Sequence, residues 1–211
     1  MITELSQLDF EKRYTYKDYI SWNLQEQVEL IQGYLFRLSP APSSEHQEIG
    51  LNIGSAMHSF LKNKNCKVFM APYDVRFYNP DDPDMIITNV VQPDICAICD
   101  LHKIDHRGCL GSPDLIVEIL SPSTSEKDLN HKYELYRSYG VREYWVVFPT
   151  EKTMLIYKLD KSGEYLSSRL FTRGDIIDSS VLDGFSLDLS KVFESFGWES
   201  YEAEEKYYQR I

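Results

Sequence analysis

The stretch Pro113-Asp-Leu-Ile-Val-Glu-Ile-Leu120 has the composition of a buried β-strand, yet two acidic residues interrupt it. Side chains alternate along a strand, so Asp114 and Glu118 should share one face with Ile116 and Leu120, while the other apolar residues face the opposite way. Both faces are apolar enough to be buried, which places Glu118 against the core or in a cleft beside it. An unpaired buried carboxylate costs several kcal/mol, so we expect a cation next to Glu118.

A second acid lies at a similar point in the apolar run that begins with Pro93-Asp94 and continues through Ile95–Ile98. If the two runs form neighbouring strands, Asp94 and Glu118 lie side by side across the sheet. Two such carboxylates can share a hard divalent ion, for which Mg²⁺ is the expected choice and Mn²⁺ a possible substitute. A metal ion held in this way polarises a phosphoryl oxygen and activates water, so the pair is suited to phosphodiester hydrolysis.

A lysine that could serve this chemistry lies in the helix predicted over residues 125–139. Leu129, Lys132, Tyr133 and Tyr136 recur there at spacings of three and four residues and form one stripe. Lys132 is the charged residue that this pattern directs toward the sheet. We expect it to orient or deprotonate the attacking water and to stabilise the charge of the transition state.

The remaining sequence surrounds these segments with further strands and helices. Strands are predicted at residues 28–31, 34–38, 67–78, 91–99, 115–120, 143–148, 153–159 and 165–171. Helices are predicted at residues 15–24, 45–63 and 125–139, with an acidic helical tail at about 198–211. The first two strands flank Gln32-Gly33 and read as an N-terminal hairpin, and the last two as a C-terminal hairpin. This order predicts a mixed sheet flanked by helices, in an α/β fold that borders on α+β.

Length and composition limit the class of protein. The chain of 211 residues contains no repeat and no long linker, so residues 1–211 are expected to form a single domain. Its 33 Asp and Glu residues exceed its 22 Lys and Arg residues, and the net charge of −11 excludes a histone-like coat for nucleic acid. No apolar run approaches the roughly 18 residues that a membrane span needs. Residues 1–13 lack the features of a secretory signal, so a cytoplasmic location is expected.

The cysteines leave a minor alternative open. They are Cys66, Cys96, Cys99 and Cys109, which are too few for a disulfide scaffold, so we expect reduced thiols. The spacing Cys-x2-Cys-x2-His-x3-His-x2-Cys over residues 96–109 contains enough ligands for tetrahedral zinc. Cys96 and Cys99 should point to opposite faces of a strand, however, which favours buried thiols. A zinc-stabilised interaction protein therefore stays a competing interpretation.

Four motifs together resemble the Uma2 family, a branch of the PD-(D/E)xK nuclease superfamily once catalogued as a domain of unknown function. They are Val-Gln-Pro-Asp94-Ile, Gly-Ser-Pro-Asp114-Leu-Ile-Val-Glu118-Ile-Leu-Ser-Pro-Ser-Thr124, Lys132-Tyr-x-x-Tyr136 and Tyr139-Gly-Val-x-Glu-Tyr-Trp145. The resemblance extends over about residues 29–184. The family's opening hairpin and first helix match around Glu29 and His46.

This resemblance implies a restriction-endonuclease-like core and Mg²⁺-dependent cleavage of DNA. Asp94 corresponds to the Asp of the PD half of the motif, and Glu118 to the acid of the (D/E)xK half. The lysine position of that half is Leu120 here, so the basic role is expected to move to Lys132.

We also expect supporting residues around the two acids and a dimeric assembly. Asp114, His46 and Glu29 are candidate supporting residues near the metal or in the shell around it. A homodimer is expected because two copies can conveniently cut two strands. Leu120 and the acidic net charge favour the competing class, a nuclease-fold module that has lost catalysis and acts by binding nucleic acid or protein.

Overall fold

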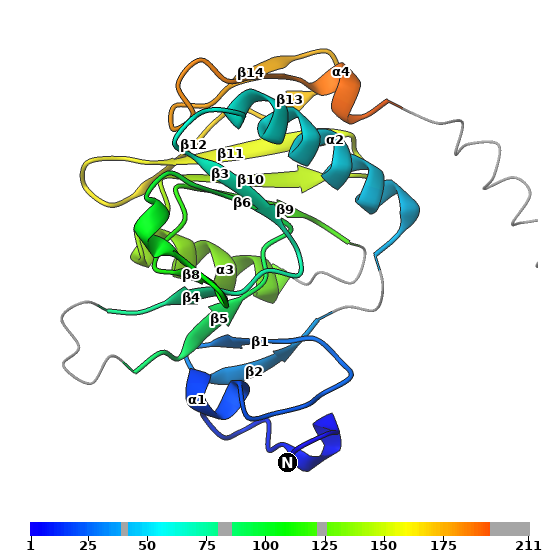
Figure 1. The fold of residues 1–211 in the computed structure, drawn as a ribbon. Helices are drawn as coiled ribbons and strands as arrows, with labels where there is room; N and C mark the ends of the chain where they lie inside the picture. The colour runs from blue at the N-terminus through cyan, green and yellow to red at the C-terminus, as the bar shows by residue number, and fades with distance from the viewer. Residues whose placement is uncertain (39–41, 80–85, 122–125, 195–211) are drawn as a thin grey trace, which may run out of the picture.

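The computed structural model describes residues 1–38, 42–79, 86–121 and 126–194, and its strands form two large sheets and a small one (Figure 1). The six-stranded sheet has the order β2-β1-β5-β4-β8-β7, and its strands are β1 Val28–Ile31, β2 Tyr34–Arg37, β4 Val75–Phe77, β5 Asn89–Val91, β7 Ile104–Asp105 and β8 Gly108–Leu110.

The seven-stranded sheet has the order β12-β11-β10-β9-β6-β3, with β13 also paired to β11. Its strands are β3 Lys67–Met70, β6 Ile95–Ile98, β9 Leu115–Ile119, β10 Glu143–Phe148, β11 Thr153–Leu159, β12 Tyr165–Ser167 and β13 Phe171–Thr172. A third, two-stranded sheet pairs β14 Ile176–Asp178 with β15 Ser186–Asp188.

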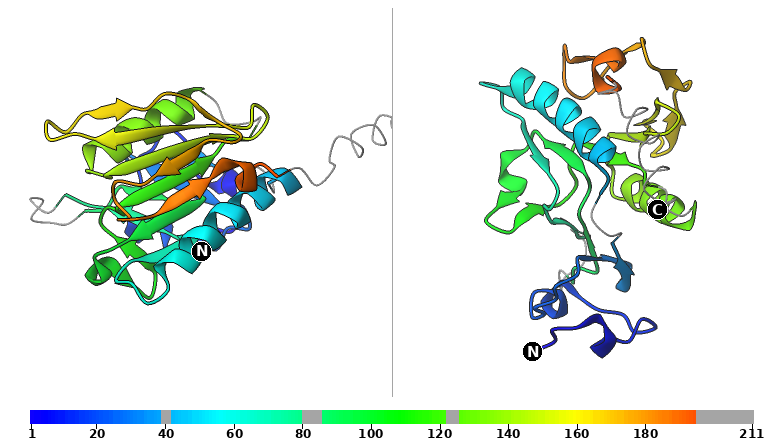
Figure 2. Two further views of the ribbon diagram at one scale, coloured as in Figure 1. Left: turned by 90° about the horizontal axis from the view of Figure 1, so that it is seen from above. Right: turned by 90° about the vertical axis from the view of Figure 1, so that its right-hand side faces the viewer.

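The helices are α1 Tyr16–Tyr19, α2 Ser44–Leu61, α3 Glu126–Ser138 and α4 Leu189–Val192, with short 3-10 turns η1 Leu5–Gln7 and η2 Leu101–Lys103. In the described parts of the chain, none of them has the length and apolar character to cross a membrane. The N-terminal hairpin lies at one end of the molecule and α4 at the other (Figure 2). These mixed sheets with few helices confirm the predicted fold class, on its α+β side.

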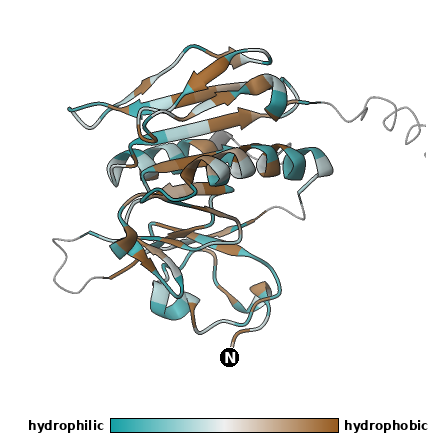
Figure 3. Cartoon of the chain, turned by 45° about the horizontal axis from the view of Figure 1, so that its top comes forward, coloured by the Kyte–Doolittle hydropathy of each residue, from teal (hydrophilic) through white to brown (hydrophobic). Residues whose placement is uncertain are grey.

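Helices α2 and α3 cover opposite faces of the seven-stranded sheet (Figure 1). Ile53 of α2 belongs to the apolar cluster that contains Leu115 and Val117 of β9, whereas Ile116 clusters with Tyr136 of α3. The central strands are correspondingly apolar, while the two helices carry polar stretches as well (Figure 3). The predicted alternation along β9 is therefore confirmed, and Glu118 lies on the α3 side.

Two predicted strands were wrong in extent, because each divides between the two large sheets. The run 67–78 separates at Pro72 into β3 and β4, and the run 91–99 separates at Pro93 into β5 and β6. Proline has no N–H to donate, so it interrupts a β-ladder. Asp94 consequently lies where the chain passes from one sheet to the other.

Other predictions were incomplete or lie outside the described residues. Helix α1 is shorter than the range 15–24, although Thr15 and Asp18 form the expected reciprocal cap. The sequence analysis missed the β7–β8 and β14–β15 hairpins. The predicted helical tail at 198–211 falls outside the residues described.

The cysteine prediction was wrong for one pair, because Cys66 and Cys99 form a disulfide. Cys96 and Cys109 are free and buried, as expected. The bonded sulfur of Cys99 also removes a ligand from the zinc arrangement considered for residues 96–109. We therefore discard the interpretation as a zinc-stabilised protein.

Breaking this disulfide should lower the free energy of unfolding by about 3–4 kcal/mol, because it closes a loop between residues 33 apart in sequence. Urea denaturation of the wild type with and without reductant would measure the loss. A Cys66→Ser/Cys99→Ser double variant serves as the control, since its stability should not respond to reductant. A wild type whose stability and free-thiol count are unchanged by reductant would contradict the pairing.

The buried carboxylate of Glu143 holds the segment before β15 onto the sheet. It is 0% exposed and accepts hydrogen bonds from Trp145 Nε1, Ser179 Oγ, and both the N–H and the Oγ of Ser180. Glu143→Ala should lower the free energy of unfolding by about 3 kcal/mol, because these donors lose their acceptor. Glu164→Ala, which alters an exposed ion pair, should change it by less than about 0.5 kcal/mol in the same urea titration.

Candidate active site

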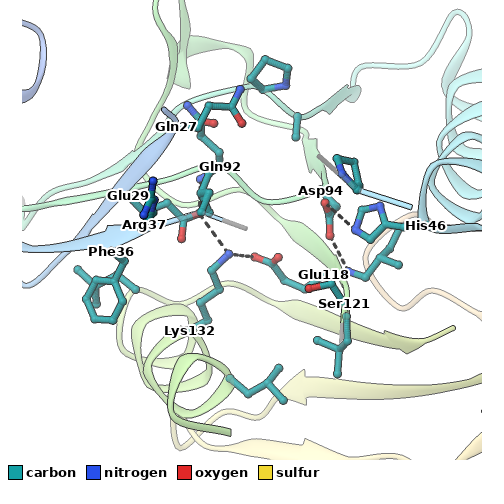
Figure 4. A pocket seen from close by; sticks show the side chains of 18 of the residues that line it. Gln27, Glu29, Phe36, Arg37, His46, Gln92, Asp94, Glu118, Ser121 and Lys132 are labelled. Carbon is teal, nitrogen blue, oxygen red and sulfur yellow. Dashed lines mark hydrogen bonds and ion pairs between the residues drawn. The ribbon is translucent and has the colours of Figure 1, made fainter. Parts of the chain in front are cut away.

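Carboxylates from both large sheets meet a single lysine in a pocket of about 360 Å³ (Figure 4). Glu29 comes from β1 of the six-stranded sheet and Glu118 from β9 of the seven-stranded sheet. Asp94 precedes β6, Lys132 lies on α3 and His46 lies on α2. The pocket therefore depends on the packing of both sheets and of the two long helices.

Asp94 and Glu118 are neighbours because β6 and β9 pair in antiparallel fashion. Ile95 lies opposite Val117 in this pair, so the register continues to Asp94 opposite Glu118. The backbone N–H of Ile119 donates to Asp94 Oδ2 over 2.7 Å. The expected side-by-side arrangement of the two acids is thus present.

Glu118 is only 7% exposed, and the cation expected beside it is Lys132. Its Oε1 accepts hydrogen bonds from Lys132 Nζ at 2.9 Å and from Tyr136 Oη at 2.6 Å. Burial raises the pKa of Glu118 to about 7; Lys132 opposes this rise, whereas the charges of Asp94 and Glu29 add to it. Burial and the neighbouring carboxylates together therefore outweigh the effect of Lys132 on the pKa of Glu118.

Lys132 bridges carboxylates that come from different sheets. Its Nζ lies 3.2 Å from Glu29 Oε1, and Glu29 is itself 2% exposed. Burial lowers the pKa of Lys132, but the carboxylates of Glu118 and Glu29 raise it by more. The pKa of Lys132 therefore lies well above its ordinary value. The backbone N–H of Gln92 also donates to Glu29 Oε1, over 2.7 Å, and fixes this end of the bridge. Lys132 is therefore held as an ammonium group.

His46 reaches the site from the first turn of α2. Its backbone N–H donates to Ser43 Oγ, which caps the helix, and its Nε2 lies 3.4 Å from Asp94 Oδ1. Burial lowers the pKa of His46, but the hydrogen bond and charge of Asp94 raise it above the ordinary value overall. Its Nδ1 is buried and has no hydrogen-bond partner among the described residues. His46 thus points toward Asp94 in the pocket (Figure 4).

Asp114 is the candidate that does not reach the pocket. It lies at the other end of β9, where it pairs with Arg142 and accepts a hydrogen bond from the backbone N–H of Cys99. Tyr136 was not predicted as a contact of Glu118 but only as a member of the stripe on the helix. Its position one helical turn after Lys132, on the same face, was the signal that could have identified it.

The residues present suit a hard divalent cation. In the described part of the chain, no three His, Cys, Asp or Glu side chains gather closely enough to form a complete metal cage. Mg²⁺ does not require one, because it usually takes one or two carboxylates and completes its shell with water and substrate phosphate. Asp94 and Glu118 supply oxygen donors, and a bound cation would offset the burial and the neighbouring negative charges that raise the pKa of Glu118.

A mixed sheet flanked by helices, with acids on adjacent strands beside a lysine, has the form of a restriction-endonuclease-like nuclease fold. The chain belongs to the Uma2 family, whose model, described as "Putative restriction endonuclease", matches residues 15–190.

Individual proteins are similar over most of the chain. A Synechocystis protein named "Uncharacterized protein slr1290" is 23% identical over 153 residues, which cover 71% of this chain and 76% of that protein. The crystal structure of a protein from Anabaena variabilis, described as a "putative nuclease belonging to DUF820", superposes with a TM-score of 0.65 at 19% identity. That match covers 86% of this chain and 98% of the other, and it establishes the shared fold.

Proposed function

We propose that this protein is a metal-dependent endonuclease that hydrolyses phosphodiester bonds in DNA, with Mg²⁺ as its ion. The observation that carries the proposal is the juxtaposition of Asp94 and Glu118 with Lys132, whose Nζ is 2.9 Å from Glu118. Membership of a family described as "Putative restriction endonuclease" supports nuclease chemistry. The two acids and the lysine support the more specific proposal of a PD-(D/E)xK-like site, in which the lysine comes from α3 and not from the strand that carries Glu118.

Each group in the pocket has a distinct part in this proposal. Asp94 and Glu118 would hold the ion, which when bound supplies Lewis-acid polarisation of the phosphodiester. Lys132, held as a cation, would donate hydrogen bonds to the attacking water and offset the negative charge that develops on the phosphoryl group. Because its pKa is raised, it would act as a donor and not as the base.

The displaced lysine explains how Leu120 can occupy the usual lysine position. Leu120 lines the same pocket, but Lys132 reaches Glu118 from α3, so the positive charge enters from the helix and not from the strand. Glu29 supports the site by anchoring the lysine, and His46 by contacting Asp94. These supporting roles, like the homodimer, are proposals.

Cleavage of supercoiled and single-stranded DNA by the purified protein tests the proposal. We expect nicked or linear products with Mg²⁺ or Mn²⁺ and none in EDTA, because the carboxylates need a cation to approach phosphate. Gel electrophoresis of both substrates would follow the products, and sedimentation at the assay concentration would give the oligomeric state. Equal cleavage in EDTA would contradict metal dependence.

A binding module without catalysis is the second candidate. The observations that favour it are Leu120 at the usual lysine position and the net charge of −11. It predicts that the wild type binds Mn²⁺, and either nucleic acid or a protein partner, yet leaves every DNA substrate intact, so the cleavage assay separates it from the nuclease.

A further inference from the structure

Tyr136 contacts Glu118 from within the core, where no substrate reaches it. The ring is 0% exposed, packs edge to face on Tyr144 with ring centroids 5.1 Å apart, and lies 6.0 Å from the ring of Phe77. Neighbours on both sides therefore fix the direction of its hydroxyl. That hydroxyl donates to Glu118 Oε1 over 2.6 Å.

Among the described residues, two groups donate hydrogen bonds to the Glu118 carboxylate, and both donate to the same oxygen. Lys132 Nζ and Tyr136 Oη both contact Oε1, and the two residues lie four positions apart on α3, one helical turn from each other. A carboxylate held by two donors on one oxygen cannot turn freely about its terminal bond. Its second oxygen is then directed away from α3.

We infer that Tyr136 is a positioning residue, which orients the Glu118 carboxylate so that Oε1 faces α3 and the other oxygen is presented to a divalent cation. This inference rests on the proposed function and adds a residue to that site. The hydrogen bond of Ile119 to Asp94 Oδ2 has the same effect on the neighbouring acid, whose Oδ1 faces His46. Glu118 is thus held by groups of the fold through one oxygen, whereas Asp94 is contacted at both, by Ile119 at Oδ2 and by His46 at Oδ1.

The chain contains a matched control for this hydroxyl. Tyr165 is also a buried tyrosine in the same aromatic cluster, but its hydroxyl donates to the backbone carbonyl of Val141, and it does not line the pocket. Tyr136→Phe and Tyr165→Phe each remove a single buried hydroxyl donor. They differ in that only Tyr136→Phe removes a donor from Glu118.

Mn²⁺ binding, followed by electron paramagnetic resonance, is the first measurement. We expect Tyr136→Phe to weaken Mn²⁺ binding by about 10–100-fold, the usual effect of removing a hydrogen bond from a ligating group. Tyr165→Phe, whose hydroxyl bonds the Val141 carbonyl and not Glu118, should stay within about twofold of the wild type by the same reasoning. Equal Kd values for the two variants, both with native-like melting temperatures, would overturn the assignment.

A crystal structure of metal-free Tyr136→Phe provides a readout that does not depend on the metal. The Glu118 carboxylate should rotate away from its wild-type orientation, and an unchanged orientation would overturn the positioning role. A different result would contradict the proposed function itself: a wild type that binds no Mn²⁺, or a Glu118→Gln variant that binds it as tightly as the wild type does. In that case the crystal structure still decides whether Tyr136 orients Glu118.

Discussion

Glu118→Gln should reduce metal-dependent DNA cleavage by roughly 10³-fold, the upper range for losing one preorganised electrostatic group. The amide keeps the size of the side chain and an oxygen that can accept from Tyr136 and Lys132, so the fold should persist. It lacks the negative charge that pairs with Asp94 to hold a cation. The initial rate of loss of supercoiled DNA, at several Mg²⁺ concentrations, measures the effect.

Asp114→Asn is the matched control for this substitution. Asp114 directly precedes β9, at the end of the strand far from Glu118, where it is bonded to Arg142 and to the Cys99 backbone. The control should retain cleavage within a few-fold of the wild type, after correction for any loss of folded protein. If Glu118→Gln cut as fast as Asp114→Asn, the activity would not belong to this pocket.

Lys132→Met should reduce the rate of cleavage by about 10²–10³-fold while leaving the affinity for Mn²⁺ equal to or higher than that of the wild type. Methionine removes the ammonium group that bridges Glu29 and Glu118, so no fixed cation competes with the metal for these carboxylates. Because Lys132 also lowers the pKa of Glu118, its loss raises that pKa further, and the Mn²⁺ titration is made at alkaline pH, where Glu118 is ionised. The opposite directions of the two effects separate a catalytic lysine from a structural one. Single-turnover cleavage and Mn²⁺ titration of the same preparation measure them.

Lys103→Met supplies the comparison. Lys103 Nζ donates to the carbonyl of Ser112 and does not line the pocket, so its replacement should leave cleavage near the wild-type rate. Weaker Mn²⁺ binding by Lys132→Met, in parallel with its lower cleavage rate, would instead indicate that the pocket had collapsed around the buried Glu29 carboxylate. A melting curve in the presence of Mg²⁺ checks that possibility directly.

Local patterns in the sequence were sufficient to predict the strand that carries Glu118 and the helix that carries Lys132. The alternation over residues 115–119 depends only on the two-residue repeat of a strand, and the position of Lys132 only on the helical repeat. The cost of burying a carboxylate then required a cation beside Glu118. That part of the site could be predicted because each step concerns one element and its own periodicity.

The prolines show where local reasoning failed. Pro72 and Pro93 each interrupt an apolar run, and the chain moves between sheets at both points. The sequence marks such a break, but the partner that each half finds depends on hydrogen bonds to strands far away in the chain. The Cys66–Cys99 disulfide was missed for a related reason, because β3 and β6 had first to pair before the two sulfurs could meet.

The sequence by itself determined the strand that carries Glu118, the helix that carries Lys132, the family resemblance and the pairing of an anomalous carboxylate with a cation. Only the tertiary structure decided that Glu29 and Glu118 share one lysine, that His46 contacts Asp94, and that Asp114 lies outside the pocket. Periodicity specifies which way a side chain points from its own strand or helix. The distance between side chains on different elements depends on strand register and helix packing, and those are set by contacts distributed over the whole chain.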